Sequence, residues 1–398
     1  MRILKTGQRI GKFFVALSAV LFFMAFFLPT AEFAREPECV CVLNNSPELP
    51  QDQAEQSITI SALGDCALGA EYGQQGVTFH TVFALNNGDY SYFFSGVHPV
   101  LSEDDLTIAN LETSLTKAWN RIDKSYLKYA FWIKGEPEYA RILTEGSVEA
   151  VSVANNHTYD YREEGFLETL ISLKTAGVDY FGFDQVLIKE IKGIKIGLLG
   201  FTEFNVGGRW RSYSDMKTLV HSAIQALAPG TDLIIVSFHW GNEKEIKPTA
   251  TQRELAHLAI EAGADLVLGH HPHVLQGMEE YQGKQIVYSL GNFCFGANRV
   301  PYDRDTLIYQ QTFTFQEGIL TGTSMKLIPC SMTTAPTGND FRPTLLEGAE
   351  AERVLLKIEE RIRLISQDHQ NDQDQEIGQD YQNDPDHEID QDKQNDLS

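Results

Sequence analysis

Along residues 57–315, short apolar runs rich in β-branched residues alternate with stretches in which apolar residues recur at helical spacing. The strand-like runs are Ile58–Leu63, Leu106–Ala109, Ala150–Ala154, Ile194–Leu199, Leu233–Phe238, Leu266–Leu268 and Ile286–Leu290, and the helical patterns are Glu163–Ala176, Ser214–Ala228 and Thr249–Ala262. This alternation is typical of an α/β domain whose sheets are covered by helices. We therefore predict one α/β domain over residues 57–346.

The pattern changes toward the C-terminus. Leu307–Phe315 and Ile319–Ile328 have the alternation of an antiparallel hairpin, and residues 347–366 have the pattern of a charged amphipathic helix. Residues 367–398 form acidic 12-residue repeats, in which 367–378 recurs as 379–390. Because these repeats are too polar to bury a core, we predict that they are disordered.

The N-terminal segment, residues 1–34, has the pattern of a targeting sequence. Basic residues precede a 16-residue apolar run, Phe13–Leu28, which is typical of a signal peptide or an N-terminal membrane anchor. No Lys or Arg follows Arg35 until Lys117, so the positive-inside bias places the body outside the cytoplasm. We predict a cell-membrane protein, or a secreted or periplasmic one if the segment is cleaved, with residues 35–56 as a linker.

The net charge and its distribution along the chain exclude some classes of function. Of the net charge of −23, residues 1–34 carry +3 and residues 367–398 carry −10, which leaves −16 for the body. A nucleic-acid partner is excluded on this basis, because phosphate binding needs a basic surface. Five cysteines in 398 residues also exclude a small disulfide-stapled scaffold.

Polar side chains that can bind a metal ion follow nearly every predicted strand. They occur in Gly64-Asp65, Asn110-Leu111-Glu112, Asn155-Asn156-His157 with Asp160 close behind, His239-Trp240-Gly241, Gly269-His270-His271-Pro272-His273 and Ser289-Leu290-Gly291-Asn292-Phe293. Ligands of α/β sheets gather at the carboxyl ends of the strands. Imidazole, carboxylate and amide groups together suit Mn, Zn or Fe better than calcium.

The number of candidate ligands favours two divalent ions, because one tetrahedral ion needs fewer groups. The His271-Pro272-His273 segment is the strongest element of the set. Pro272 stiffens it, and alternate residues of an extended segment project to the same side.

Taken in order, the motifs GD, NLE, NNH-x-x-D, HWG, GHHPH and SLGNF resemble the CapA family of bacterial capsule-synthesis proteins, relatives of calcineurin-like metallophosphatases. The resemblance covers residues 57–315. It implies a four-layer α-β-β-α sandwich of the metallophosphatase type and membrane anchorage outside the cytoplasm. It also implies a role in making an anionic polymer, poly-γ-glutamate, alongside membrane synthase components.

The resemblance also assigns roles to individual residues. The metal ligands that it implies are Asp65, Glu112, Asn156, His239, His271 and His273, and it implies that His157 assists the leaving group. His270 becomes a neighbour of the ligands. Two departures from the phosphatase pattern, the missing His of the D-x-H motif and the replacement of the second Gly-Asp by Asn110-Leu111-Glu112, predict that one metal position is weak. Arg162 stands where the family usually has Gly.

Substrate contacts are the next expectation. We assign Asn110, Asp160, Arg209, Arg211 and Asn292 to substrate binding, since an arginine pair is suited to clamping an anion. The basic residues Lys117, Arg121, Lys124, Lys128 and Lys134, interleaved with aromatic residues, either line the same cleft or form a solvated helix face.

Three functional hypotheses remain open from the sequence. The first is an extracytoplasmic CapA-like protein of poly-γ-glutamate production with a metallophosphatase-like metal site. The second is a metal-dependent phosphoesterase that hydrolyses an external phosphate ester. The third is a binding module without metal. Fold resemblance alone does not establish turnover, so whether the protein is a hydrolase stays open at this point.

Overall fold

The computed structural model describes residues 55–126, 128–204, 206 and 212–382, with side chains described as far as residue 367. The predicted N-terminal targeting segment, the linker to residue 54 and residues 383–398 lie outside this part of the chain. Within the described part, no helix combines the length and apolar character that a membrane crossing needs.

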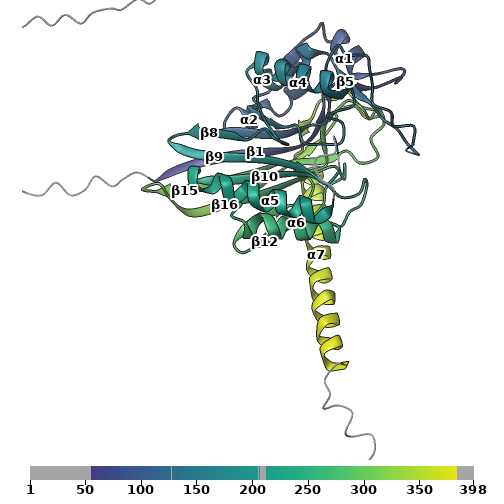
Figure 1. Cartoon of the computed structure of the whole chain (residues 1–398). Helices are drawn as coiled ribbons and strands as arrows, with labels where there is room; N and C mark the ends of the chain where they lie inside the picture. The colour runs from purple at the N-terminus through teal and green to yellow at the C-terminus, as the bar shows by residue number, and fades with distance from the viewer. Residues whose placement is uncertain (1–54, 127, 205, 207–211, 383–398) are drawn as a thin grey trace, which may run out of the picture. The chain divides into compact units, whose positions relative to one another are not determined.

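Two mixed sheets form the centre of the described domain (Figure 1). The first has the order β17-β16-β15-β1-β3-β6-β7, with β14 also paired to β1, and the second has the order β12-β13-β11-β10-β9-β8. The first sheet comprises β1 (Gln56–Ala67), β3 (Leu106–Leu111), β6 (Ala150–Ser152), β7 (Asp179–Phe181), β14 (Asn292–Phe295), β15 (Asp305–Gln316), β16 (Ile319–Ser331) and β17 (Thr344–Leu345).

The second sheet carries the other half of the parallel strands. It comprises β8 (Leu187–Ile191), β9 (Ile194–Thr202), β10 (Leu233–His239), β11 (Leu266–His270), β12 (Met278–Tyr281) and β13 (Lys284–Val287). A small third sheet contains β2 (Ala70–Glu71), β4 (Ser114–Leu115) and β5 (Ile133–Gly135). The predicted hairpin is confirmed as β15 and β16, which pair antiparallel.

Helices cover the outer faces of both main sheets. The α-helices are α1 (Phe79–Leu85), α2 (His98–Leu101), α3 (Ala140–Glu145), α4 (Arg162–Ala176), α5 (Tyr213–Leu227), α6 (Ala250–Glu261) and α7 (Gly348–Gln382). Short 3-10 turns occur at Tyr90–Phe94, Pro137–Tyr139 and Ala228–Gly230. The helices α3 and α4 lie on one side of the paired sheets, and α5 and α6 lie on the other (Figure 1).

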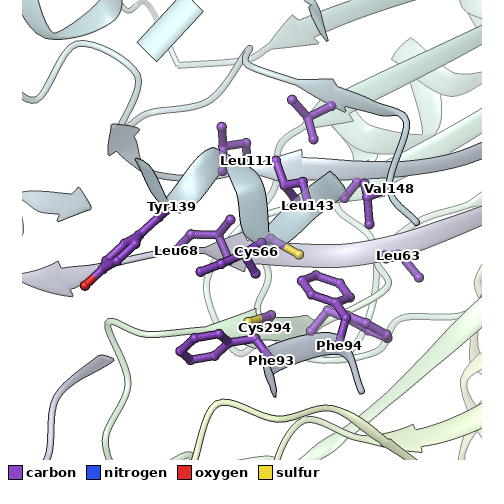
Figure 2. Close-up of a cluster of buried hydrophobic side chains, with 14 of the residues drawn as sticks. Leu63, Cys66, Leu68, Phe93, Phe94, Leu111, Tyr139, Leu143, Val148 and Cys294 are labelled. Atoms are coloured by element: carbon purple, nitrogen blue, oxygen red, sulfur yellow. The ribbon is translucent and has the colours of Figure 1, made fainter. Parts of the chain in front are cut away.

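Apolar cores fill the spaces between these layers. Ile60 and Ile108 of the first sheet meet Leu198 and Ile235 of the second in the core between the sheets. The outer face of the first sheet packs against α3 and α4 in a second core, where the thiols of Cys66 and Cys294 are buried beside Phe93 and Phe94 (Figure 2). The predicted four-layer α-β-β-α sandwich is therefore confirmed.

The C-terminal helix differs from its predicted bounds. It starts at Gly348 but continues to Gln382, so the first acidic repeat is helical rather than disordered. Val354 and Ile358 of α7 are buried in the core between the sheets, which anchors the N-terminal half of the helix. An anchored helix propagates more easily than an isolated one, because its nucleus is already formed.

Candidate metal centre

Strand register gathers the predicted polar residues at one edge of the two sheets. Asp65 is the pairing partner of Asn110 on β3 and of Asn292 on β14. In the second sheet, His239 is the pairing partner of His270. The close approach of β1 to β14 requires glycine, because a Cβ on Gly64 would lie 2.0 Å from the carbonyl oxygen of Gly291.

Glu112 occupies the centre of this cluster. It follows β3, is fully buried, and neither carboxylate oxygen has a hydrogen-bond partner. Its Oε1 lies 3.7 Å from Nε2 of His239 and 3.8 Å from Nε2 of His157 and of His273. Burial raises the pKa of the Glu112 carboxyl well above its usual range.

These distances fit ligands that share an ion better than ligands that bond to one another. They are too long for hydrogen bonds. Two ligand atoms each ~2.1 Å from one tetrahedral ion lie ~3.4 Å apart, close to what is observed. Two triads each offer ligand atoms within 4.8 Å of one another, namely Glu112 with His271 and His273, and Asp65 with Glu112 and His239.

Asp65 is the second buried carboxylate, and it differs from Glu112 in being well bonded. Its Oδ1 accepts from Nδ2 of Asn110 at 2.8 Å, and its Oδ2 lies 3.2 Å from Nδ1 of His273. Burial alone would raise its pKa, but the neighbouring imidazoles of His270, whose Nδ1 lies 3.5 Å from Oδ1, and of His273 outweigh burial and lower the pKa well below the usual value. Asp65 is therefore a stable carboxylate in the folded protein.

The His271-Pro272-His273 segment is a turn, which corrects the extended segment expected from the sequence. His271 and His273 both have positive φ, 96° and 57° respectively, and their ring centroids lie 5.4 Å apart. Both rings converge because of the turn, not because of strand alternation. Nδ1 of His271 and both ring nitrogens of His270 are buried without a hydrogen-bond partner.

Burial also favours the neutral, metal-binding form of two of the imidazoles, those of His271 and His239. Desolvation, followed by the charge of His273, lowers the pKa of His271 to about 3. Desolvation is likewise the main cause that lowers the pKa of His239 well below the usual value. Neutral imidazole is the form that binds metal, so both side chains are in the ligand state at neutral pH.

Asn156 and His157 reach the cluster from the loop after β6. Oδ1 of Asn156 accepts from Nε2 of His239 at 2.9 Å. Nδ1 of His157 donates to Oδ2 of Asp160 at 2.7 Å, which directs Nε2 toward Glu112. Asp160 was expected to contact substrate, but it is fully buried behind His157, where it also accepts from Lys124 and from the Ile133 backbone.

Of the remaining residues predicted to bind substrate, two lie among the candidate ligands and two lie outside the described part of the chain. Asn110 is fully buried and donates to Asp65 and to Nδ1 of His239. Asn292 accepts from Nδ1 of His273 at 3.0 Å, so both asparagines orient candidate ligands instead of facing a substrate. Arg209 and Arg211 lie outside the described residues.

A cleft of about 1090 Å³ opens beside the cluster, and Asn156, His157 and His271 belong to its lining. The described residues of the basic segment, 117–126 and 128–134, are not helical, which excludes the alternative of a solvated helix face. Lys124 and Lys128 line the cleft, together with the exposed rings of Tyr126 and Tyr129.

The other basic residues of that segment are engaged elsewhere. Lys117 pairs with Glu136, and the Arg121 guanidinium lies 3.5 Å from the ring centroid of Tyr72. Sequence reasoning did not assign Arg162 and Lys244, which also line the cleft. The substitution of the usual Gly by Arg162 was a signal that could have identified one of them.

Comparison with known proteins gives a consistent set of relatives. The chain is 30% identical over 266 residues to the capsule biosynthesis protein CapA of Bacillus anthracis, covering 60% of each chain. It is 29% identical over 219 residues to the PGA biosynthesis protein CapA of Bacillus subtilis (strain 168), covering 51% of this chain and 56% of the relative. The chain thus matches less than two thirds of the length of these relatives.

Among solved structures, a phosphatase from Mycoplasma pneumoniae matches with 14% identity and a TM-score of 0.40, covering 69% of this chain and 95% of that one. The family model described as bacterial capsule synthesis protein PGA_cap matches residues 59–297, more than half of the chain. The chain therefore belongs to the PGA_cap family of bacterial capsule synthesis proteins.

Proposed function

We propose that this chain is a divalent-metal-binding protein of poly-γ-glutamate capsule production, which acts outside the cytoplasm on the anionic polymer. Its membership of the PGA_cap family and the capsule and PGA biosynthesis names of its Bacillus relatives support this choice of polymer. The observation that carries the metal site is the unpartnered, fully buried Glu112 carboxylate, which faces three imidazole nitrogens at 3.7–3.8 Å.

The cluster of candidate ligands fits a metal ion, because without one its buried polar groups lower the stability of the fold. A buried carboxylate without a hydrogen bond is expensive, and the neighbouring His271 also has a buried ring nitrogen, Nδ1, without a partner. Asp65, Glu112, Asn156, His239, His271 and His273 would hold Mn, Zn or Fe, in two positions of which one is weaker. A bound ion would supply Lewis-acid polarisation of an anionic oxygen.

The chain's own residues complete this site. His157 does not need to be a ligand, since its Nδ1 is held by Asp160 and its Nε2 faces the cluster. An imidazole held in this way keeps one tautomer and presents one nitrogen to a substrate. Lys124 in turn fixes Asp160 from the cleft wall.

The location and the partners belong to the same proposal. The basic and apolar residues 1–34 support a signal or membrane anchor, and the relatives' role in capsule synthesis supports membrane synthase components as partners. Fusing a reporter enzyme that is active only outside the cytoplasm after residue 56 tests this location. A reporter active only inside the cytoplasm would contradict it.

Metal analysis tests the centre directly. We expect the purified full chain to hold at least one Mn, Zn or Fe ion, measured by elemental mass spectrometry, and Asp65→Ala, Glu112→Ala and His271→Ala to reduce that content. Glu243→Ala, which changes an exposed acid of the cleft, is the matched control. Unchanged metal in all three ligand variants would contradict the centre, and wild-type protein with less than one ion per chain would favour a metal-free binding module.

A metal-dependent phosphoesterase is the second candidate function. The observation that favours it is the His157–Asp160 pair beside the cluster, where an imidazole nitrogen faces the cleft. Turnover of a phosphate monoester or diester by the Mn- or Zn-loaded chain, abolished by His157→Ala with metal retained, would support it. No turnover in the loaded wild-type chain would favour the accessory role.

A further inference from the structure

The cleft is much larger than one phosphate or carboxylate group. Its volume is about 1090 Å³, at the upper end of the range for small-molecule sites. Only its floor belongs to the candidate metal centre, through Asn156, His157 and His271. The walls therefore leave room for parts of a ligand that extend beyond a group held at the floor.

Three exposed cations line these walls, namely Lys128, Arg162 and Lys244. Glu243 is the acid among the lining residues, and Asp123 lies close enough to Arg162 for the guanidinium to contribute, after hydrogen bonds from Ser125, to lowering the Asp123 pKa. Lys124 is neutralised by buried Asp160. The walls are thus net positive in a body that carries −16.

Two of the three cations sit in unfavourable backbone conformations. Arg162 has φ = 60° and Lys244 has φ = 65°, the left-handed region that favours glycine. A side chain in this region is strained, and such strain persists where the surroundings impose it. Gly would fit both positions without this strain, so Arg162→Gly and Lys244→Gly remove the cations while leaving the backbone conformation favourable.

Both cations are tied by backbone hydrogen bonds to turns of the metal centre. The Arg162 N–H donates to the Tyr159 carbonyl at 2.8 Å, within the turn that carries His157. The Lys244 N–H donates to the Pro272 carbonyl at 2.7 Å, between His271 and His273. Their positions relative to the candidate ligands are therefore fixed by main-chain geometry.

We propose that Arg162 and Lys244 form a second anion-binding site on the cleft walls, which selects ligands carrying several negative charges along a chain over ligands with a single anionic group. This rests on the proposed function, since it concerns the same cleft. One charge of such a ligand faces the metal centre, while neighbouring charges contact the two cations from separate turns. The two residues determine specificity and need not touch the reacting group.

The test uses the metal-loaded full chain and two probes, poly-γ-glutamate and inorganic phosphate. We expect Arg162→Gly with Lys244→Gly to weaken poly-γ-glutamate binding about tenfold at low salt, since each exposed charge contact is worth a few-fold. The dependence of Kd on salt should become weaker, because two salt-screened charge contacts are lost. Phosphate affinity should stay within about twofold of wild type.

Matched variants separate charge from backbone. Arg162→Lys keeps the charge and should retain most polymer affinity. Lys192 also has positive φ (50°) but lies in the β8–β9 turn, away from the cleft lining, so Lys192→Gly controls for strain relief and loss of a cation. Gly suits the backbone at all three positions, so thermal midpoints should show folded proteins.

Each outcome is decisive for one proposal or the other. Polymer binding by the double variant that equals wild type, or an equal loss in Lys192→Gly, would overturn the second anion site. A wild-type chain that holds metal but binds no poly-γ-glutamate would overturn it too, while the metal centre would stand. If the chain holds no metal yet loses polymer binding in the double variant, the anion site stands and the metal centre fails.

Discussion

The floor and the walls of the cleft differ in how far their side chains are buried. Beneath the floor, Asp65 and Glu112 are fully buried. On the walls, Tyr126 and Tyr129 are 78% and 68% exposed. The floor is a preformed charged site whose groups lack water, whereas the walls keep their charges hydrated. Substitutions should therefore change stability strongly on the floor and weakly on the walls.

The largest expected effect comes from breaking the buried pair of Asp160 and Lys124. Asp160→Asn leaves the Lys124 ammonium buried without its counter-charge, which should lower the free energy of unfolding by about 3–5 kcal/mol. Urea unfolding followed by circular dichroism measures this loss. Asp123→Asn, a neighbouring exposed acid, is the control and should leave the midpoint unchanged. Similar midpoints for both variants would mean that Asp160 is not structurally required.

The opposite sign is expected at Glu112. Its buried carboxylate has no partner, so Glu112→Gln should raise the free energy of unfolding of the metal-free protein by about 1–3 kcal/mol. The comparison is made after dialysis against a chelator, because a bound ion would reverse the effect. A less stable metal-free variant would show that the carboxylate is already compensated by its neighbours.

A smaller effect concerns pH and His271. Burial, followed by the charge of His273, lowers the pKa of His271 to about 3. Below about pH 6.5, His271 is therefore protonated in the unfolded chain but stays neutral in the folded chain. Stability of the metal-free protein should fall as pH decreases from 6.5 toward 3. In His271→Asn, that fall should be shallower by up to about 1.4 kcal/mol per pH unit.

Urea midpoints measured at several pH values between 6.5 and 4 test this expectation. His221→Asn, a histidine of the α5 surface, is the control for removing an imidazole away from the centre. Parallel curves for wild type and His271→Asn would contradict a neutral buried His271.

The smallest effect is expected on the walls. Tyr126→Ala and Tyr129→Ala remove rings that are mostly exposed, so the free energy of unfolding should change by less than about 0.5 kcal/mol each. Thermal unfolding checks this, with the fully buried Phe293→Ala as the contrasting variant. A large loss at either tyrosine would show that the wall contributes to the folded core.

The sequence by itself determined which loops carry the chemistry. Apolar periodicity placed the strands, and strand ends placed Asp65, Glu112, Asn156 and His239 at one edge, because parallel strands end on the same side of a sheet. This inference needs only to know which side chains are buried and which face water, and the pattern of apolar and polar residues within each segment shows this.

The tertiary structure decided how those loops meet. The left-handed turn at His271 and His273, the burial of Asp160 behind His157 and the strained cations Arg162 and Lys244 depend on contacts between segments far apart in the chain. Local patterns carry no information on such contacts, because a turn's φ values and a carboxylate's neighbours are set by how two sheets pack. Val354 and Ile358 pack in the core between the sheets and anchor α7, which continues through a repeat whose composition alone predicts disorder.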